Sequence, residues 1–481
     1  MVASARTRPH PIYLAGRWVD SRDLLVVEDP ARPGEPAGAT YNATPAQLEE
    51  AITAAAAAFE STRKMAAFER SAALRHISAG IEARREELGR LIARESGKPI
   101  RDALTEVDRG ALTFRIGAEE AERIGGEVLP LDLNAASRGR TGITRRFPIG
   151  PIAAISPFNF PLNLAAHKLA PAIASGDPIV LKPPSKDPLT MLAVAEIVAE
   201  AGLPEGAVSI LPMTRDLGDR MVSDERFKLL TFTGSPAIGW RMKERAGKKK
   251  VVLELGGSAG VIVDRSAEID WAVRRTLVGA FSYAGQVCIS VQRLFVHEAV
   301  WDDFMSRFVE GARGLRMGDP LDPLTDLGPM VDSRAVARTQ AWVDEAVSLG
   351  GKLLLGGKAE GSYFAPTVLV DTPLEAQVCR GEAFAPLVVA APFADFGDAV
   401  RRVNDSVYGL QAGVFTNDLA NAWAAFEGLD VGGVIVNDVP TYRIDHMPYG
   451  GSKDSGQGRE GIRYAIDEMT EIRLMVLASP S

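Results

Sequence analysis

Cysteine is scarce in this chain, with only two among its 481 residues. Two cysteines are too few for a disulfide framework, so we expect a protein of a reducing compartment, here the cytoplasm. The N-terminal residues carry charge but no apolar stretch follows them, which argues against a secretory signal. No apolar run approaches the ~18 residues of a membrane-spanning helix, so we expect no membrane association.

Basic residues are fewer than acidic ones in this chain, and histidine is rare. Asp and Glu number 62 against 54 Lys and Arg, and the resulting net charge of −8 argues against a nucleic-acid partner. A local basic pocket for an anionic substrate remains compatible with this balance. The five histidines show neither i,i+4 pairing nor a neighbouring carboxylate cluster, so we expect no metal site. A G-x-x-x-x-G-K-[ST] phosphate loop is also absent from the sequence.

The order of the expected elements indicates an α/β fold. A chain of this length exceeds what one hydrophobic core usually holds, so we expect two or three domains. Residues 45–125 are alanine-rich and helical in pattern, and Thr44 and Gln47 have the spacing of a capping box. From about residue 150 apolar strands alternate with helices, which predicts βαβ units and a mostly parallel sheet. The expected strands are 152–155, 178–181, 207–211, 229–233, 251–255 and 260–263, and the expected helices are 161–175, 189–202 and 216–222.

Two glycine-containing patterns lack their usual context. Residues 456–461 match the dinucleotide pattern G-x-G-x-x-G, but they lie near the C-terminus without a βαβ unit. Ser258 matches the G-x-S-x-G pattern of hydrolase nucleophiles, which requires a helix directly after the serine. Residues 261–264 have the pattern of a strand instead, so we interpret Ser258 as a turn residue.

Cys288 is the candidate nucleophile. It lies in the segment GQVCIS, which has the character of an exposed turn. Glu254 interrupts an apolar strand, and a carboxyl group so placed is either paired or raised in pKa, as suits a general base. Asn159 lies between aromatic residues and prolines at a strand end, where a side-chain amide can donate to an oxyanion. A buried thiol and a turn asparagine remain the alternatives for Cys288 and Asn159.

Candidate cofactor contacts follow two of the expected strands. Gly234 and Ser235 lie between a strand and a helix, where free N–H groups and the helix dipole can bind a phosphate. At the end of another strand, Lys182 is a candidate for a ribose hydroxyl, and Ser185 and Lys186 are candidates for an additional phosphate. An ordinary βα turn and a solvated loop are the alternatives for these two segments.

Taken together, these segments closely resemble the aldehyde dehydrogenase superfamily. They occur in the family's order and approximate spacing, and the resemblance covers nearly the whole chain from about residue 10. The matching segments are 156–161 (SPFNFP), 181–183 (LKP), 232–235 (FTGS), 253–257 (LELGG), 285–288 (GQVC), 382–386 (EAFAP) and 448–456 (PYGGSKDSG). Some likeness extends to lactaldehyde dehydrogenases and to non-phosphorylating glyceraldehyde-3-phosphate dehydrogenases.

The resemblance implies a fold of three parts. These are a Rossmann-like cofactor domain of residues 1–125 and 146–253, an α/β catalytic domain of residues 254–440, and a small β-flap of residues 126–145 and 465–481. The flap implies a homodimer or homotetramer, because exchange of edge strands between subunits satisfies open sheet edges.

The resemblance also implies NAD(P)-dependent oxidation of an aldehyde to a carboxylate. Cys288 would attack the aldehyde carbon to form a thiohemiacetal, whose oxyanion would be held by Asn159 and the backbone N–H of Cys288. Loss of a hydride to the cofactor would leave a thioester, and Glu254 would activate the water that hydrolyses it.

Cofactor contacts are carried over in the same way. The implied residues are Phe158 in the cleft, Glu382 and Phe384 at the nicotinamide, Lys182 at the adenosine ribose, and Gly234 and Ser235 at the pyrophosphate. NAD-preferring members usually carry glutamate where this chain has Ser185, and Lys186 follows it. This change removes a repulsive carboxylate and adds a positive charge, so our hypothesis is that NADP is accepted, or even preferred over NAD. Residues 212–218 replace a glycine-rich stretch common in the family, which predicts an altered adenine pocket.

Two arginines bear on the substrate. By family analogy Arg109 and Arg443 flank the substrate tunnel, which suggests a small polar or anionic aldehyde. Examples are lactaldehyde, a phosphorylated or phosphonylated aldehyde, and a semialdehyde. Alternatively, Arg109 pairs with Asp108 or Asp102, and Arg443 pairs with Asp445.

Three other functions remain open at this point. A CoA-acylating aldehyde dehydrogenase would resolve the thioester with CoA rather than water, and Glu254 argues against it. A non-enzymatic binding protein on the same scaffold would not need Cys288, Asn159 and Glu254 together. A cysteine hydrolase would need a histidine beside Cys288, and none has a persuasive local context. We interpret the second cysteine, Cys379, as structural.

Overall fold

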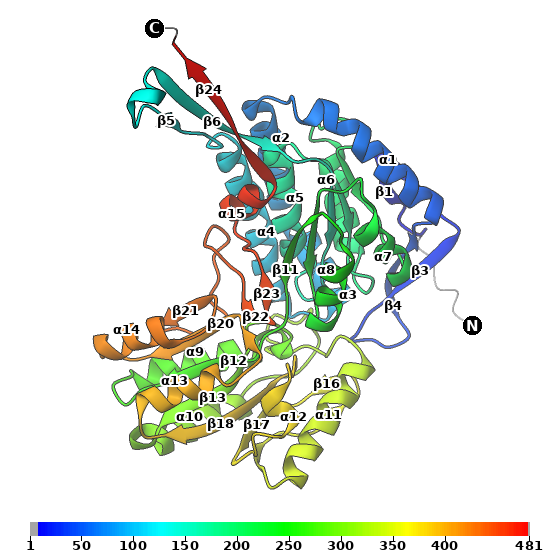
Figure 1. Ribbon diagram of the computed structural model, residues 1–481. Coiled ribbons are helices and arrows are strands. Elements are labelled where there is room, and N and C mark those ends of the chain that lie inside the picture. Colours follow the sequence, from blue (N-terminus) through cyan, green and yellow to red (C-terminus); the bar gives the residue numbers. More distant parts are fainter. Residues whose placement is uncertain (1–7, 480–481) are drawn as a thin grey trace, which may run out of the picture.

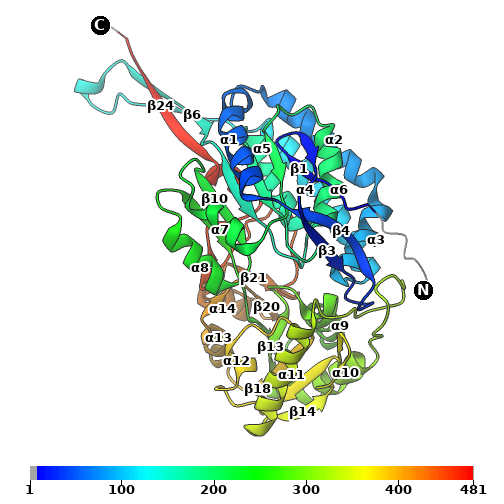
Figure 2. The ribbon, with the colours of Figure 1, turned by 90° about the vertical axis from the view of Figure 1, so that its right-hand side faces the viewer.

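A computed structural model describes residues 8–479 (Figure 1). The chain forms two α/β units, each built on a large sheet, and a narrow third sheet that projects away from them (Figure 2). The ranges 1–7 and 480–481, which belong to the predicted cofactor domain and flap, lie outside the described residues. Within 8–479, no helix combines the length and the apolar character needed to cross a membrane.

The first large sheet is mostly parallel. In spatial order its eight strands are β2 (Arg17–Val19), β1 (Ile12–Leu14), β9 (Val208–Ile210), β8 (Ile179–Lys182), β7 (Ile152–Ile155), β10 (Leu229–Thr233), β11 (Lys250–Glu254) and β23 (Gly456–Gln457). Strands β9, β8, β7, β10 and β11 run parallel, whereas β1, β2 and β23 pair antiparallel at the edges. The βαβ units predicted from alternating apolar segments are therefore present.

Helices cover both faces of the first sheet. One face carries α2 (Ala67–Ala83), α3 (Arg85–Ser96), α4 (Ile100–Ala121), α5 (Asn163–Ser175), α6 (Leu189–Ala199) and α15 (Ile462–Glu468). The other face carries α1 (Pro45–Thr62), α7 (Arg215–Ser223) and α8 (Pro236–Arg245). The predicted capping box of Thr44 and Gln47 begins α1. Helix α6 ends at Ala199 rather than at residue 202, because Gly202 has a φ of 71° that no helix continues.

The second large sheet is also mostly parallel. In spatial order its seven strands are β14 (Lys352–Leu355), β17 (Thr367–Val370), β18 (Leu387–Phe393), β13 (Val291–His297), β12 (Ala259–Val263), β20 (Gln411–Phe415) and β21 (Gly433–Val436), and only the edge strand β14 is antiparallel. Helices α9 (Ile269–Phe281) and α10 (Trp301–Arg313) pack on one face, and α13 (Phe396–Asn404) and α14 (Leu419–Gly428) pack on the other. Helices α11 (Ser333–Ser348) and α12 (Gln377–Arg380) cover β17 and β18.

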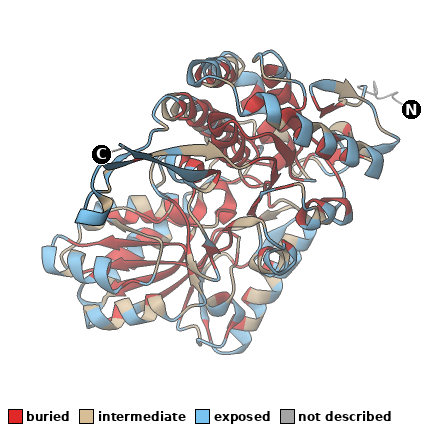
Figure 3. Ribbon diagram, turned by 45° about the horizontal axis from the view of Figure 1, so that its top comes forward, coloured by how far each residue is buried: buried red, intermediate tan, exposed pale blue. Residues whose placement is uncertain are grey.

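The third sheet is antiparallel and exposed. It consists of β5 (Val128–Pro130), β6 (Arg140–Pro148) and β24 (Thr470–Ala478), and Figure 3 shows β24 exposed while the two large sheets are buried between their helices. Apolar side chains that stay exposed on β24 are Ile472, Leu474, Met475, Val476 and Leu477. The predicted flap overlaps this sheet, and its use in oligomerisation stays a prediction. Short elements complete the fold: β3 (Asp23–Glu28), β4 (Pro36–Asn42), β15 (Ala359–Glu360), β16 (Tyr363–Phe364), β19 (Tyr408–Gly409), β22 (Ser452–Lys453), η1 (Ala135–Ser137), η2 (Ser282–Gly285) and η3 (Glu298–Val300).

The two large units are joined beside Glu254. This residue ends β11 of the first sheet, and β12 of the second sheet begins at Ala259. The chain later returns from the second unit, and β23 pairs with β11 so that Gly456 lies opposite Glu254. Both crossings therefore bring residues of the two units together around the end of β11.

Candidate active site

Cys288 lies between η2 and β13, in the wall of a cavity of about 220 Å³. Its side chain is half-buried, not exposed as the turn-like sequence suggested, because the flanking Val287 and Ile289 pack into a hydrophobic cluster with Tyr283 and Tyr449. Other residues that line the cavity are Lys98, Glu106, Arg109, Phe160, Asn163 and Arg443.

A hydroxyl and a cation lie beside the Cys288 thiol. The Cys288 Sγ is 3.1 Å from Tyr449 Oη, which is hydrogen-bond distance for sulfur. Burial raises the pKa of the Cys288 thiol to about 12, while the Tyr449 hydroxyl and the Arg443 charge oppose that rise. The guanidinium carbon of Arg443 lies 3.7 Å from the centre of the Tyr449 ring, a cation–π contact.

Glu254 is a buried carboxyl group without a structural partner. It is 2% exposed, and among the described residues neither of its oxygens has a hydrogen-bond partner. Burial, followed by the neighbouring Glu460 carboxylate, raises the pKa of Glu254 well above its usual value. Gly450 allows the chain to pass close by, because a Cβ there would lie 2.8 Å from Glu254 Oε1. Within the described residues, both carboxyl oxygens are therefore buried and unpaired.

The turn at Gly256 and Gly257 brings Cys288 and Glu382 close to the end of β11. A Cβ at Gly257 would lie 2.4 Å from the Cys288 carbonyl oxygen, and a Cβ at Gly256 would lie 2.4 Å from Glu382 Oε2. The Gly257 N–H donates to Glu382 Oε1 over 3.0 Å. Because only glycine permits this approach, the turn determines how three of the predicted site residues meet.

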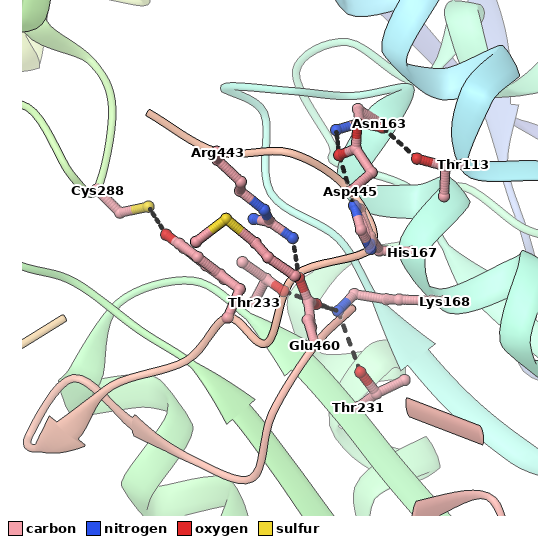
Figure 4. A network of polar contacts seen from close by, with 12 residues as sticks. Thr113, Asn163, His167, Lys168, Thr231, Thr233, Cys288, Arg443, Asp445 and Glu460 are labelled. Atoms are coloured by element: carbon pink, nitrogen blue, oxygen red, sulfur yellow. Dashed lines mark hydrogen bonds and ion pairs between the residues drawn. The ribbon is translucent and has the colours of Figure 1, made fainter. Parts of the chain in front are cut away.

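A buried ionic network lies beside the cavity (Figure 4). Arg443 Nη2 donates to Glu460 Oε2 over 2.9 Å, and Lys168 Nζ donates to Glu460 Oε1 over 3.2 Å. Lys168 also donates to Thr233 Oγ1 over 2.7 Å and to Thr231 Oγ1 over 3.1 Å. Burial opposes the ionisation of Glu460, but Lys168 and Arg443 outweigh it and lower its pKa to about 2. Two cations thus share one carboxylate.

Arg109 and Arg443 both line the cavity that contains Cys288, and their ionic partners differ from the alternatives considered for them. Arg109 donates to both carboxyl oxygens of Asp445, over 2.7 and 3.2 Å. Asp445 also accepts from Asn163 and lies 2.9 Å from His167 Nε2. The alternatives that paired Arg443 with Asp445, and Arg109 with an aspartate of its own helix, are therefore wrong. Adjacent helical residues point in different directions, and Asp445 approaches from a distant loop.

Asn159 lies in a loop that a buried ion pair holds at both ends. Its carbonyl accepts from Lys98 Nζ over 2.7 Å, and Lys98 is ion-paired with Glu106, both side chains being fully buried. Glu106 Oε1 accepts the N–H groups of Leu162 and Asn163 over 2.9 and 3.2 Å. The side-chain amide of Asn159 makes no hydrogen bond within the described part of the chain, so its donors remain available.

The predicted nicotinamide residues come together from the two units. The rings of Phe158 and Phe384 meet edge-to-face with their centres 5.7 Å apart. Phe384 has a φ of 49°, a strained backbone conformation of the kind found at functional sites. Burial raises the pKa of Glu382 to about 7. Ser235, preceded by Gly234, is the N-cap of α8, and its side chain makes no capping bond. Gly234 donates its N–H to the Glu254 carbonyl, Pro236 has none, and Ile238 donates to the Ser235 carbonyl. Among the described residues, the N–H groups of Ser235 and Ala237 are therefore the ones left for a phosphate at this turn.

The predicted adenosine contacts lie at the end of β8. Lys182 Nζ donates to Ser185 Oγ over 3.1 Å. Burial, followed by the charge of Arg215, lowers the pKa of Lys182 to about 8. Lys186 is ion-paired with Asp332, the N-cap of α11, so its charge is not free as the sequence suggested. Arg215 supplies a second cation instead, and it belongs to the segment predicted to alter the adenine pocket. Aromatic rings, a helix N-terminus and a lysine beside a hydroxyl, all at neighbouring strand ends, are groups that would fit a nicotinamide dinucleotide.

Sequence reasoning missed five residues around the cavity. They are Tyr449, Glu460, Lys168, Lys98 and Glu106. A lysine in an otherwise apolar helix, such as Lys168 in α5, was the available signal, because a buried ammonium group requires a partner. Tyr449 lies in the family-matching segment 448–456, but nothing local indicated its contact with sulfur, because that contact joins two distant segments.

Known proteins are similar to this chain in fold and in sequence. Residues 18–475 match the aldehyde dehydrogenase family. The chain is 40% identical over 478 residues to 3-sulfolactaldehyde dehydrogenase of Priestia aryabhattai, covering 99% of this chain and 100% of the relative. Aldehyde dehydrogenase 21 of Physcomitrella patens, solved with the reaction product succinate, superposes with a TM-score of 0.96 at 47% identity, covering 98% and 99% of the two chains. Glyceraldehyde-3-phosphate dehydrogenase GapN of Methanocaldococcus jannaschii, solved with NADP, superposes with a TM-score of 0.92 at 37% identity. The match covers 95% of this chain and 100% of GapN.

The chain therefore belongs to the aldehyde dehydrogenase family, and the resemblance seen in its sequence is confirmed. It is an oxidoreductase with the aldehyde dehydrogenase fold and the NAD(P)-dependent aldehyde oxidation typical of that family.

Proposed function

We propose that this enzyme oxidises a small polar aldehyde, preferably one with an anionic group, to the carboxylate. The observation that carries the proposal is the placement of Cys288 in a small cavity beside Arg443, with the unpartnered carboxyl of Glu254 at the end of β11. A cavity of about 220 Å³ is below the ~300–1,000 Å³ of sites for drug-sized ligands, which favours a small substrate.

Cys288 and Asn159 carry the first step. The Cys288 thiolate attacks the aldehyde carbon, a carbon–sulfur bond forms, and the carbonyl π electrons move to the oxygen. The oxyanion accepts hydrogen bonds from the Asn159 amide and from the Cys288 N–H. Lys98 and Glu106 hold the Asn159 loop, so the amide donor is oriented before substrate arrives.

Cofactor residues lie on both units. Phe158, Phe384 and Glu382 would hold the nicotinamide end, and Lys182 and Ser185 the adenosine end. When bound, the nicotinamide supplies a hydride acceptor, so that the carbon attached to sulfur is oxidised to a thioester. Lys182 and Ser185, with the charge of Arg215 acting on Lys182, offer positive charge and a hydroxyl that would suit a 2′-phosphate, which supports acceptance of NADP as well as NAD.

Glu254 carries the second step. Its carboxylate accepts a proton from water, the resulting hydroxide adds to the thioester, and the carbon–sulfur bond breaks to regenerate the Cys288 thiolate. A raised pKa suits this role, because a more basic carboxylate accepts a proton from water more readily.

Arg443 is the stronger candidate for binding a substrate anion. Arg443 and Lys168 both pair with the single carboxylate of Glu460, so one positive charge of the two is left without a counter-charge in this group of three. Arg109, by contrast, is bound at two points by its own partner, Asp445. The relative named for sulfolactaldehyde and the relative solved with succinate also handle anionic molecules, which supports the same substrate class.

The chemistry is tested with Glu254→Gln. With a reactive aldehyde this variant should release roughly one equivalent of reduced cofactor per site and then stop, with the acylated Cys288 visible by intact mass. Cys288→Ser should give no reduced cofactor, and Cys379→Ser is the matched control with unchanged turnover. Wild-type turnover by Glu254→Gln would contradict its role as the base. An acyl-CoA product formed only with CoA would support the acylating alternative instead, and no cofactor reduction with any aldehyde would support a binding protein.

The substrate class is tested with Arg443→Met. Because hydrogen bonds to charged groups contribute ~1.5–3 kcal/mol, KM for acidic aldehydes should rise about tenfold or more, and KM for neutral aldehydes should change less. Arg109→Met should have a smaller effect on that ratio, because Asp445 already neutralises Arg109. Equal effects of Arg443→Met on both kinds of aldehyde would contradict the proposal.

A further inference from the structure

The Tyr449 hydroxyl has one hydrogen-bond partner within the described residues, and that partner is the nucleophilic sulfur. Tyr449 is 2% exposed, so its hydroxyl has little access to bulk water. Its Oη lies 3.1 Å from Cys288 Sγ. A buried O–H group without an acceptor is costly, and the Cys288 sulfur is the acceptor that the fold provides.

We propose that the Tyr449 hydroxyl donates a hydrogen bond to Cys288 Sγ and stabilises the thiolate form of the nucleophile. The inference rests on the proposed function to the extent that Cys288 is taken as the nucleophile. It adds a catalytic group that touches the reacting atom and that the proposed mechanism does not use.

The direction of this hydrogen bond follows from the chemistry of the two groups. A phenol O–H is a strong donor, whereas a thiol S–H is a weak one, and a thiolate is a far better acceptor than a thiol. Burial, followed by the negative charge of ionised Cys288, raises the pKa of Tyr449. The phenol therefore keeps its proton when the sulfur ionises, and it remains the donor.

The surrounding contacts hold the Tyr449 ring in place and make its hydroxyl a stronger hydrogen-bond donor. The Tyr449 ring packs in a hydrophobic cluster with Val287, Ile289 and Leu410. The guanidinium carbon of Arg443 lies 3.7 Å from the centre of the same ring. A cation over the ring withdraws electron density from the phenol, which makes the O–H a better donor. Arg443 is in turn held by Glu460 over 2.9 Å, so the ring has little freedom to move.

The hydrogen bond acts on the ionisation that precedes attack. The thiol releases its proton to solvent water, and the electron pair of the broken S–H bond stays on sulfur. That pair then forms the carbon–sulfur bond while the carbonyl π electrons move to oxygen. Tyr449 favours the ionised state before attack, and its hydrogen bond weakens as charge leaves the sulfur. A lower thiol pKa also makes the thiolate somewhat less nucleophilic, with a Brønsted coefficient of ~0.4–0.5.

Tyr449→Phe removes only the hydroxyl and is tested by alkylation of Cys288. The assay uses the full chain in a Cys379→Ser background, with iodoacetamide and without aldehyde or cofactor, between about pH 6 and pH 10, below the thiol pKa. A loss of one pKa unit of stabilisation lowers the thiolate fraction tenfold, and the Brønsted compensation leaves about a threefold slower alkylation at each pH. Tyr442→Phe, at an exposed tyrosine of a neighbouring loop, is the matched control and should react at the parent rate.

A second measurement keeps the inference testable if Tyr449→Phe folds poorly. Fluorotyrosine labelling makes every phenol more acidic, so alkylation of Cys288 in the labelled parent should be faster than in the unlabelled parent. Labelling should leave the rate unchanged in any folded Tyr449→Phe protein. Equal or faster alkylation of Tyr449→Phe, or no effect of labelling on the parent, would overturn the inference. Because neither assay needs turnover, a failure of the proposed aldehyde chemistry would be seen separately, as absent cofactor reduction with normal Tyr449-dependent alkylation.

Discussion

Replacing Lys98 with methionine should both destabilise the first unit and slow catalysis. Lys98 and Glu106 form an ion pair with no exposed side-chain surface. Lys98 Nζ also donates to the Asn159 carbonyl over 2.7 Å and lies 3.7 and 4.6 Å from the ring centres of Phe160 and Tyr283. Methionine fills a similar volume but leaves the Glu106 carboxylate buried without its cation.

The expected cost follows from that uncompensated charge. Removing one partner of a buried ion pair typically destabilises a protein by ~3–5 kcal/mol, whereas removing both is far less harmful. The double variant Lys98→Met/Glu106→Gln should therefore recover most of the lost stability, because a glutamine oxygen can still accept the two backbone N–H groups. The Asn159 loop would lose its lysine contact in both variants, and a misplaced oxyanion donor costs about 100-fold in kcat/KM.

Urea unfolding of the wild type, the single variants and the double variant measures the first effect, and steady-state kinetics measures the second. The lost stability should return in the double variant while kcat/KM stays low. If the double variant were as unstable as Lys98→Met, the uncompensated charge would not be the cause. If Lys98→Met kept wild-type kcat/KM, the lysine would not position Asn159.

Three further predictions concern pH, cofactor choice and assembly. Since Glu254 must ionise to act as a base and burial raises its pKa, kcat should rise with pH through a pKa above that of an ordinary glutamate. The same raised pKa means that unfolding releases the Glu254 proton, so Glu254→Gln should gain stability over wild type as pH rises above the usual carboxyl pKa, as seen in urea midpoints. Ser185→Glu should lower kcat/KM for NADP more than for NAD, and Arg215→Ala should do so to a smaller extent; a clearly higher wild-type kcat/KM for NAD than for NADP would show that NADP is not preferred. Charged residues at the exposed apolar positions Leu474 and Val476 should convert the expected dimer or tetramer into a smaller species by light scattering, and an unchanged mass would contradict a role of β24 in assembly.

Much of the fold follows from local sequence patterns. Apolar runs such as 229–233, bounded by polar turns and helices, predicted strands because side-chain periodicity and length are local properties. The capping box of Thr44 and Gln47 is equally local and begins α1 as expected. The end of α6 differs from the prediction, because the positive φ at Gly202 stops the helix earlier.

The pairing of charged side chains could not be predicted from local sequence patterns. Lys186 was expected to offer a free charge, yet α11 brings Asp332 to it. Arg443 was considered as a partner of its sequence neighbour Asp445, but Arg443 pairs with Glu460. Asp445, in a loop, pairs instead with Arg109 of helix α4. Each pairing depends on segments that only the packing of the folded chain brings together, so nearness in sequence did not predict it.

The sequence by itself determined the α/β class, the family and the kinds of residue that carry the chemistry, because strand periodicity and short motifs are written locally along the chain. The tertiary structure alone decided that Cys288 is half-buried, that Glu254 has no partner, and that Tyr449 and Arg443 lie beside the sulfur. The physical reason is that burial, desolvation and hydrogen bonding depend on distances across the junction of the two units. Those distances are set by the packing of segments far apart in the chain, such as those of Cys288 and Tyr449, which are 161 residues apart.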